Sequence, residues 1–264
     1  MLLGFVLALF SGSLVGFTLG LIGGCGSILA TPLMLYVVGL EPHVAIGTSA
    51  FAVSVNAFAN FANHVRKGDV RWKSAILFAL FGIAGAAIGS TVGKTIDGKQ
   101  LLFLFAILMI GVGVLMLRNG HGEDSSSRAV SGRIGFKSVV MIIVTSLAVG
   151  ALSGFFGIGG GFLIVPGLLF STGMSMIEAV GSSLLSVGTF GLTTAVNYAI
   201  VGKIDWPVAM EFIVGGIAGG LAGTQLAGTL SHKKSALRQV FAGLVFVVAL
   251  YMLYENAIAF GIRL

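Results

Sequence analysis

The sequence predicts an all-α integral membrane protein built from two inverted repeats of about five membrane segments each. Three observations support this fold class. Hydrophobic residues make up 56% of the 264 residues and charged residues only 9%, the two halves match at a fixed offset, and equivalent loops differ in charge. Because a soluble domain carries about 25% charged residues, a chain with so few charges must have lipid as its main solvent.

Ten apolar runs follow one another along the chain. They span 2–22, 27–39, 44–65, 74–93, 101–117, 136–156, 161–173, 178–201, 206–230 and 239–261. The first run lacks the basic start of a signal peptide, so we interpret it as a membrane segment. Most runs approach the roughly 20 residues that cross a hydrocarbon core. The runs 27–39 and 161–173 are shorter, which predicts short broken or re-entrant helices; eight membrane segments in all are an alternative to ten.

The two halves of the chain repeat each other. A shift of 134 residues aligns 16–72 with 150–206 and gives 15 identities in 57 positions. The matches include Pro32 with Pro166 and Trp72 with Trp206, whereas chance similarity between apolar chains would match Leu, Val and Ala. The pattern therefore indicates an internal repeat, which is common among secondary transporters.

Charge divides the chain into domains and orients them. We predict a first membrane repeat at 1–117, a polar linker at 118–135 and a second membrane repeat at 136–264. Basic residues concentrate in three places: from Arg66 to Lys73, around the linker, and from Lys233 to Arg238. The positive-inside rule makes these regions cytoplasmic and puts both termini outside. The basic loop after Arg66 corresponds to the neutral "VGKIDW", so equivalent loops lie on opposite sides and the repeats are inverted.

Each short run follows a glycine cluster. The clusters lie in "GLIGGCGSILATP" (Gly20 to Pro32) and "GFFGIGGGFLIVP" (Gly154 to Pro166). Glycines should interrupt a membrane helix, and bare backbone at that depth survives only inside protein or beside a water-filled cavity. A helix that starts just after the break, near Gly26 and Ser27 in the first copy, would direct free N–H groups toward an anion. The alternative is that these glycines only permit tight helix crossing.

Hydroxyls and amides follow each cluster. Asn56, Asn60 and Asn63 share one helix face, where unpaired amides in lipid are costly. Thr48–Ser49 and Ser182–Ser183 are the best ligand candidates, although such hydroxyls often bond back to their own helix. The complete set of candidate substrate-binding residues is Gly23, Gly24, Cys25, Gly26, Ser27, Thr48, Ser49, Asn56, Asn63, Gly157, Gly159, Gly160, Gly161, Ser182, Ser183 and Asn197.

Other features restrict the chemistry. His64 is either an interfacial residue or a proton-coupling group. The near absence of carboxylates from the apolar runs argues against a cation pump and suits an anion substrate. We find no catalytic triad, no paired acids at hydrolase spacing, no nucleotide motif and no metal cluster, so we expect no catalytic residue, metal or cofactor, and no nucleic-acid partner. The glycine steps Gly85/Gly89/Gly93 and Gly215/Gly219/Gly223 are interpreted as helix-packing faces.

These motifs together resemble a known family. The second repeat, "GALSGFFGIGGGFLIVPGLLF", "EAVGSSLL" and "NYAIVGKIDW", is similar to the TauE/SafE family of sulfite and organosulfonate exporters. The first repeat departs from that pattern with Cys25, Ser27 and "NHVRKGDVRW". The resemblance implies transport of small sulfur-containing anions, such as sulfite, sulfoacetate or related sulfonates, across the bacterial inner membrane.

We therefore expect a secondary transporter that exports such anions, coupled to an ion gradient. The expected partners are the anionic substrate, the lipid bilayer, a coupling ion for which a proton is the first candidate, and a second copy of the chain in a homodimer. A passive anion channel and an uptake permease on the same fold are alternatives. An intramembrane enzyme is disfavoured because no catalytic constellation is present in the sequence.

Overall fold

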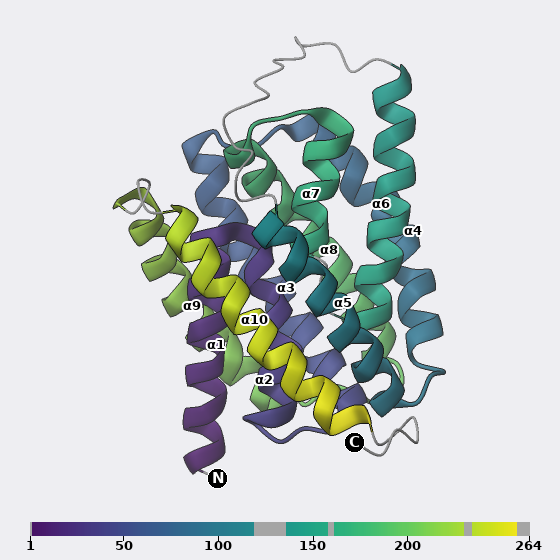
Figure 1. Cartoon of the computed structure of the whole chain (residues 1–264), viewed down its shortest axis with the longest axis vertical. Coiled ribbons are helices and arrows are strands. Elements are labelled where there is room, and N and C mark those ends of the chain that lie inside the picture. The colour runs from purple at the N-terminus through teal and green to yellow at the C-terminus, as the bar shows by residue number, and fades with distance from the viewer. Residues whose placement is uncertain (1, 119–135, 158–160, 230–233, 258–264) are drawn as a thin grey trace.

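The computed structural model describes residues 2–118, 136–157, 161–229 and 234–257, and the regular elements of these ranges are all helices (Figure 1). The first half holds five α-helices and a 3₁₀ helix, η1, and the second half holds five α-helices. In chain order they are α1 Leu2–Ile22, η1 Gly23–Leu29, α2 Ala30–Tyr36, α3 Pro42–Lys67, α4 Trp72–Gly93, α5 Gly98–Arg118, α6 Phe136–Phe156, α7 Gly161–Thr172, α8 Met176–Ala199, α9 Trp206–Thr229 and α10 Lys234–Ala257.

Six of these helices are long and apolar enough to cross a membrane: Gly4–Leu21, Pro42–Lys67, Trp72–Gly93, Val139–Phe156, Ile177–Ala199 and Trp206–Leu226. Four shorter apolar helices occur at Gly26–Tyr36, Gly98–Gly111, Leu163–Thr172 and Val245–Asn256. The prediction of an all-α, multi-pass membrane protein is confirmed. Ten membrane segments, with eight as the alternative, stay a prediction.

The helix starts follow the offset of the sequence repeat. Helices α1 and α6 span 2–22 and 136–156, and the starts of α3 and α8, and of α4 and α9, are likewise 134 residues apart. In Figure 1, α1 rises from the N-terminus at the bottom of the view, whereas α6 descends from the top. Inversion of the two repeats as whole units stays a prediction.

Helices of each half pack against helices of the other half. Helix α1 packs along α9, and α4 packs along α6. Glycines line both contacts, because a Cβ on Gly89 would overlap the carbonyl oxygen of Ala151, and one on Gly219 would overlap that of Ser13. Close backbone approach at small residues is how membrane helices pack without a hydrophobic driving force. The interpretation of the four-residue glycine steps as packing faces is therefore confirmed.

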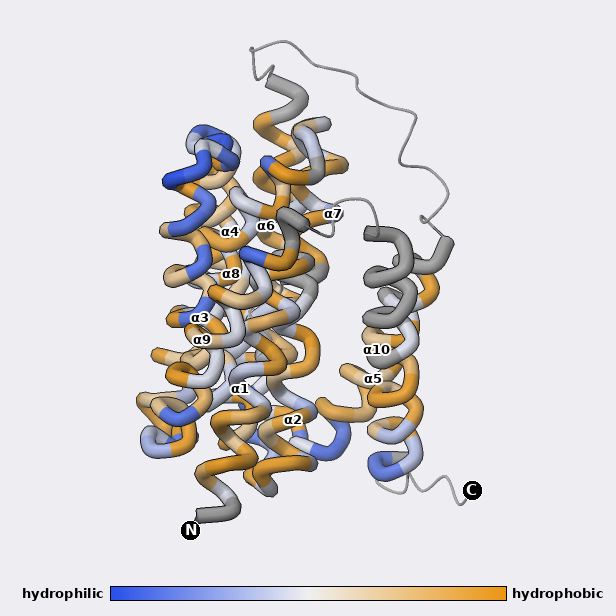
Figure 2. Tube along the Cα trace, turned by 90° about the vertical axis from the view of Figure 1, so that its left-hand side faces the viewer, coloured by the Kyte–Doolittle hydropathy of each residue, from blue (hydrophilic) through white to orange (hydrophobic). Residues whose placement is uncertain are grey.

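Helices α3 and α8 form the centre of the bundle. They pack against each other, and each also packs against a helix of the opposite half, α3 on α9 and α8 on α4. Ser54 Oγ of α3 donates a hydrogen bond to the carbonyl oxygen of Gly188 in α8, at 2.6 Å. These two residues are equivalents under the 134-residue shift, so the crossing lies where the halves meet. Helices α5 and α10 form a separate pair along one edge (Figure 2).

Both glycine clusters interrupt a helix, in different ways. After α1 the chain continues as η1, so the short apolar helix Gly26–Tyr36 begins in the 3₁₀ conformation and becomes α-helical only at Ala30. The segment "GGCGS" has low α-helix propensity, which favours the tighter 3₁₀ turn. In the second half α6 ends at Phe156, and Gly157 adopts a left-handed φ of +68°. Because η1 packs against α7 and α8, the interruption in the first half lies beside two helices of the second half.

Candidate functional site

The buried polar side chains of the described residues are uncharged. All carry hydroxyl or carboxamide groups, and no acidic or basic side chain is among them. We call the members of this set that lie on α3 and α8 the inter-repeat core: Thr48, Ser49, Ser54, Asn56, Asn60, Ser182, Ser183, Ser186 and Thr194. Groups of this kind can both donate and accept hydrogen bonds, and they carry no negative charge that would repel an anion.

Asn56 stands out within this core. Its side chain is fully buried, and neither the amide nitrogen nor the amide oxygen has a hydrogen-bond partner. The amide lies against Gly216 of α9, where a Cβ would overlap it. At the equivalent position the second half has Phe190, whose ring lies against Gly82. Burying an unpaired amide costs about 1–3 kcal/mol, so Asn56 is the strongest ligand candidate among the described residues.

Ser49 and Ser183 bond back to their own helices. Ser49 Oγ donates to the carbonyl oxygen of Ile46 at 3.1 Å, and Ser183 Oγ donates to that of Val180 at 2.8 Å. Ser49 Oγ also lies 2.9 Å from Thr31 Oγ1, which links α3 to α2. Back-bonding, the alternative interpretation of membrane hydroxyls, therefore describes both serines in this conformation.

Thr48 and Ser182 are bound to loops. Thr48 Oγ1 accepts the backbone N–H of Asp205 at 3.0 Å, and Ser182 Oγ accepts that of Arg71, also at 3.0 Å. Each hydroxyl thus reaches the loop that precedes a helix of the opposite half. In this conformation both hydroxyls have a protein partner.

Asn197 joins the end of α8 to the end of α4. Its Nδ2 donates to Ser90 Oγ at 2.7 Å and to Thr91 Oγ1 at 2.9 Å. Lys94 Nζ donates to the main-chain oxygen of Asn197 at 3.0 Å and to its Oδ1. Its equivalent, Asn63, is half-buried near the end of α3. Asn197 therefore serves as a link between helices.

Replacing Asn197 by leucine should lower the free energy of unfolding by about 2–4 kcal/mol, because the Lys94 ammonium and two hydroxyls lose a partner. Thermal unfolding in detergent measures the change. The matched control is Asn63→Leu, which alters the equivalent amide and should cost less than half as much. Equal losses in the two variants would contradict the structural role of Asn197.

His64 lies at the end of α3, close to the following loop. Its side chain is 14% exposed, and its Nδ1 lies 3.4 Å from Asp69 Oδ2. Both interpretations of His64, as an interfacial residue and as a proton-coupling group, stay predictions.

The candidate glycines are packed closely where the structure describes them. A Cβ on Gly26 would overlap backbone atoms of Thr18 and Leu19 in α1, and one on Gly157 would overlap Ile46 in α3. Ser27 is buried in η1, and Gly161 begins α7. Gly23, Gly24 and Cys25 belong to η1, while Gly159 and Gly160 lie outside the described residues.

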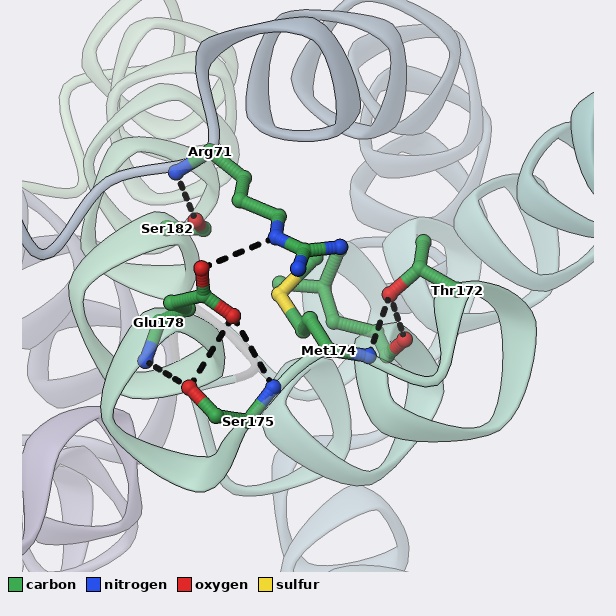
Figure 3. A network of polar contacts seen from close by, with 7 residues as sticks. Arg71, Thr172, Met174, Ser175, Glu178 and Ser182 are labelled. Atoms are coloured by element: carbon green, nitrogen blue, oxygen red, sulfur yellow. Dashed lines mark hydrogen bonds and ion pairs between the residues drawn. The ribbon is translucent and has the colours of Figure 1, made fainter. Parts of the chain in front are cut away.

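Sequence reasoning did not select Arg71 and Glu178, which the fold places beside the candidate Ser182. Arg71 Nε donates to Glu178 Oε1 at 2.9 Å, beside the bond from the Arg71 backbone to Ser182 (Figure 3). Glu178 also accepts from Ser175 in a capping box at the start of α8. Sequence reasoning also did not select Ser54, which bonds to Gly188. The alignment of these two residues in the repeat was the available signal, because small residues mark close helix crossings.

Comparison with known proteins agrees with this architecture. The family model described as "Sulfite exporter TauE/SafE" matches residues 8–252. A probable membrane transporter protein of Xylella fastidiosa (strain Temecula1) is 55% identical over 247 residues, covering 93% of this chain and 94% of its own. The probable membrane transporter protein YdhB of Bacillus subtilis is 25% identical, with 89% and 96% covered. No solved structure shows a significant match.

The helical bundle and these similarities define a multi-pass membrane transport protein. More particularly, the chain belongs to the TauE/SafE family, whose model matches nearly its whole length.

Proposed function

We propose that this protein is a secondary transporter that moves small sulfur-containing oxyanions, such as sulfite, sulfoacetate or related sulfonates, out across the bacterial inner membrane. The observation that carries the proposal is the unpaired carboxamide of Asn56 in an uncharged, buried core. An amide N–H can donate to an oxyanion oxygen, and a core free of carboxylates does not repel the anion. The name of the matching family points to the same substrate class.

The transport path in this proposal follows the inter-repeat core between α3 and α8. Two further buried hydroxyls without a hydrogen-bond partner, Ser186 Oγ in α8 and Ser153 Oγ in α6, add donors to the second half. The glycine breaks border this region, since η1 packs against α7 and α8. Substrate contacts by the remaining candidate glycines and hydroxyls form part of the same proposal.

We further propose that the two repeats are inverted, an arrangement that would support an alternating mechanism. The helix contacts come in equivalent pairs: α1 of the first half packs on α9 of the second, and α6 of the second half packs on α4 of the first. The connection between α3 and α4 and the N-terminus of α6 both lie toward the upper end of Figure 1, away from the N-terminus of α1. We assign that end, with its basic residues, to the cytoplasm, and we retain the proton as coupling ion and a homodimer as the assembly.

Flux measurements in proteoliposomes test the substrate class. We expect the purified protein to transport sulfite or sulfoacetate, and to accumulate the anion against its gradient when a proton motive force is imposed. Liposomes without protein and liposomes with the variant Gly111→Ala, which alters an open position on α5, are the controls. If the anion enters but its concentration inside the liposomes never exceeds that outside, the protein is a passive channel. Absence of flux for sulfite, thiosulfate, sulfoacetate and taurine would contradict the substrate class.

A further inference from the structure

The contacts of Thr48 and Ser182 are two copies of one arrangement. We call Gly47, Thr48 and the loop 203–205 the first clasp, and Gly181, Ser182 and the loop 69–71 the second clasp. Every member of one clasp lies 134 residues from its equivalent in the other. The glycines and hydroxyls come from the motifs "AIGTS" and "AVGSS", and the loops come from "GKIDW" and "GDVRW". The arrangement therefore gives both motifs of the repeat a shared role.

Each clasp needs both a glycine and a hydroxyl. A Cβ on Gly47 would overlap the carbonyl oxygen of Lys203, and one on Gly181 would overlap that of Asp69. The absence of a side chain lets the loop approach the helix, and the next residue accepts the N–H of Asp205 or Arg71. These N–H groups belong to the residues that directly precede α9 and α4. A clasp therefore fixes the start of a helix in the opposite half.

The two clasps lie at opposite ends of the α3–α8 pair. The first joins the start of α3 to the loop that follows α8, and the second joins the start of α8 to the loop that follows α3. Both are engaged in this conformation. The second clasp also carries the ion pair between Arg71 and Glu178 at 2.9 Å (Figure 3), whereas at the first the ion pair between Lys203 and Glu41 is longer, at 3.9 Å.

We propose that the two clasps are the gates of the transport cycle, and that release of one opens the path between α3 and α8 to one side while the other stays engaged. This inference rests on the proposed transport function. Each clasp hydrogen bond joins two neutral groups and contributes only modestly to stability, so in this proposal the engaged and released states lie close in free energy. Conformations separated by a few kcal/mol interconvert at populations that a substrate can shift. The ion pair makes the second clasp the tighter gate.

Amide hydrogen exchange measured by mass spectrometry tests the gates directly, because the clasp donors are amide hydrogens. In Thr48→Val, exchange across 200–206 should become about five- to tenfold faster. Exchange across 68–72 should become slower than in the native chain, since opening of one gate favours closure of the other. Ser182→Ala and Glu178→Gln should give the reverse pattern. A merely structural contact would change only the loop at which the substitution was made.

Control variants distinguish this opposite change at the two loops from a general loss of stability, which would accelerate exchange at both. Thr48→Ser keeps the hydroxyl, as the second half does naturally, and should restore native exchange at both loops. Thr193→Val removes a hydroxyl that bonds to its own helix, at Thr189, and should leave both loops unchanged. If Thr48→Val unfolds the protein, Ser182→Ala and Glu178→Gln carry the test alone. Acceleration at one loop with unchanged or faster exchange at the other would overturn the proposal.

The experiment uses no substrate, so its failure is distinct from a failure of the proposed function. Reciprocal exchange without flux of any sulfur anion would overturn only the substrate class. Flux of a sulfur anion without reciprocal exchange would overturn only the assignment of the clasps as gates.

Discussion

Replacing Asn56 by leucine should stabilise the fold and reduce anion transport at least tenfold. Leucine has the same number of side-chain heavy atoms and the same branching as asparagine, and the change removes two buried polar atoms that have no partner. Relief of that desolvation raises the free energy of unfolding by about 1–3 kcal/mol. The position tolerates an apolar side chain, because its equivalent in the second half is Phe190, which lies against Gly82 as Asn56 lies against Gly216.

Two measurements on the same protein decide this prediction: the unfolding midpoint in detergent and the flux in proteoliposomes. The matched control is Asn256→Leu in α10. Asn256 is also buried, but its Nδ2 donates to Tyr36 Oη at 2.9 Å and to the Met252 carbonyl oxygen at 2.8 Å. That variant should lose about 1–2 kcal/mol of stability and keep its transport. A destabilised yet fully active Asn56→Leu protein would assign Asn56 to structure alone.

Replacing Gly89 by alanine should destabilise the bundle by about 1–3 kcal/mol. The added Cβ would overlap the carbonyl oxygen of Ala151 in α6, and a backbone atom cannot rotate away as a flexible side chain can. Relief requires the whole of α4 to shift from α6, which disturbs the further glycine contacts along the same face. The free energy of unfolding in a denaturing-detergent titration measures the loss.

Two variants calibrate that measurement. Gly223→Ala makes the equivalent change in α9, where a Cβ would overlap the carbonyl oxygen of Phe17 in α1, and should cost a similar amount. Gly111→Ala in α5 places a Cβ where no atom lies within 4 Å, so it should be neutral or stabilise the helix by up to about 1 kcal/mol. Comparable losses at Gly89 and Gly111 would refute close packing as the cause.

Much of the fold follows from local patterns in the sequence. Low charge and long apolar runs require helices in lipid, because a membrane helix satisfies its own backbone hydrogen bonds. Glycine steps such as Gly85/Gly89/Gly93 mark packing faces, and the glycine clusters mark interruptions. The offset that aligns Trp72 with Trp206 also aligns the helix starts. The detailed course of the first interruption was less predictable, since α and 3₁₀ turns differ by little in free energy over a few residues.

The sequence indicates the residue types of the candidate site, but it does not distinguish the roles of individual residues. The sequence directed attention to the hydroxyls and amides of α3 and α8, several of which are buried, and their contact with a substrate stays a prediction. It could not separate Asn56, whose carboxamide has no hydrogen-bond partner, from Asn197, which bonds to the end of α4. Both are asparagines in similar apolar surroundings, and only the positions of other helices distinguish them.

The sequence by itself therefore determined the class of protein, the repeat, the helices and their interruptions, because each depends on residues close together in the chain. Only the tertiary structure decided which helices of the two halves pack together and which groups Thr48 and Ser182 bind. Their partners, Asp205 and Arg71, lie 157 and 111 residues away along the chain. A hydrogen bond over such a separation depends on the packing of whole helices, which no local pattern records.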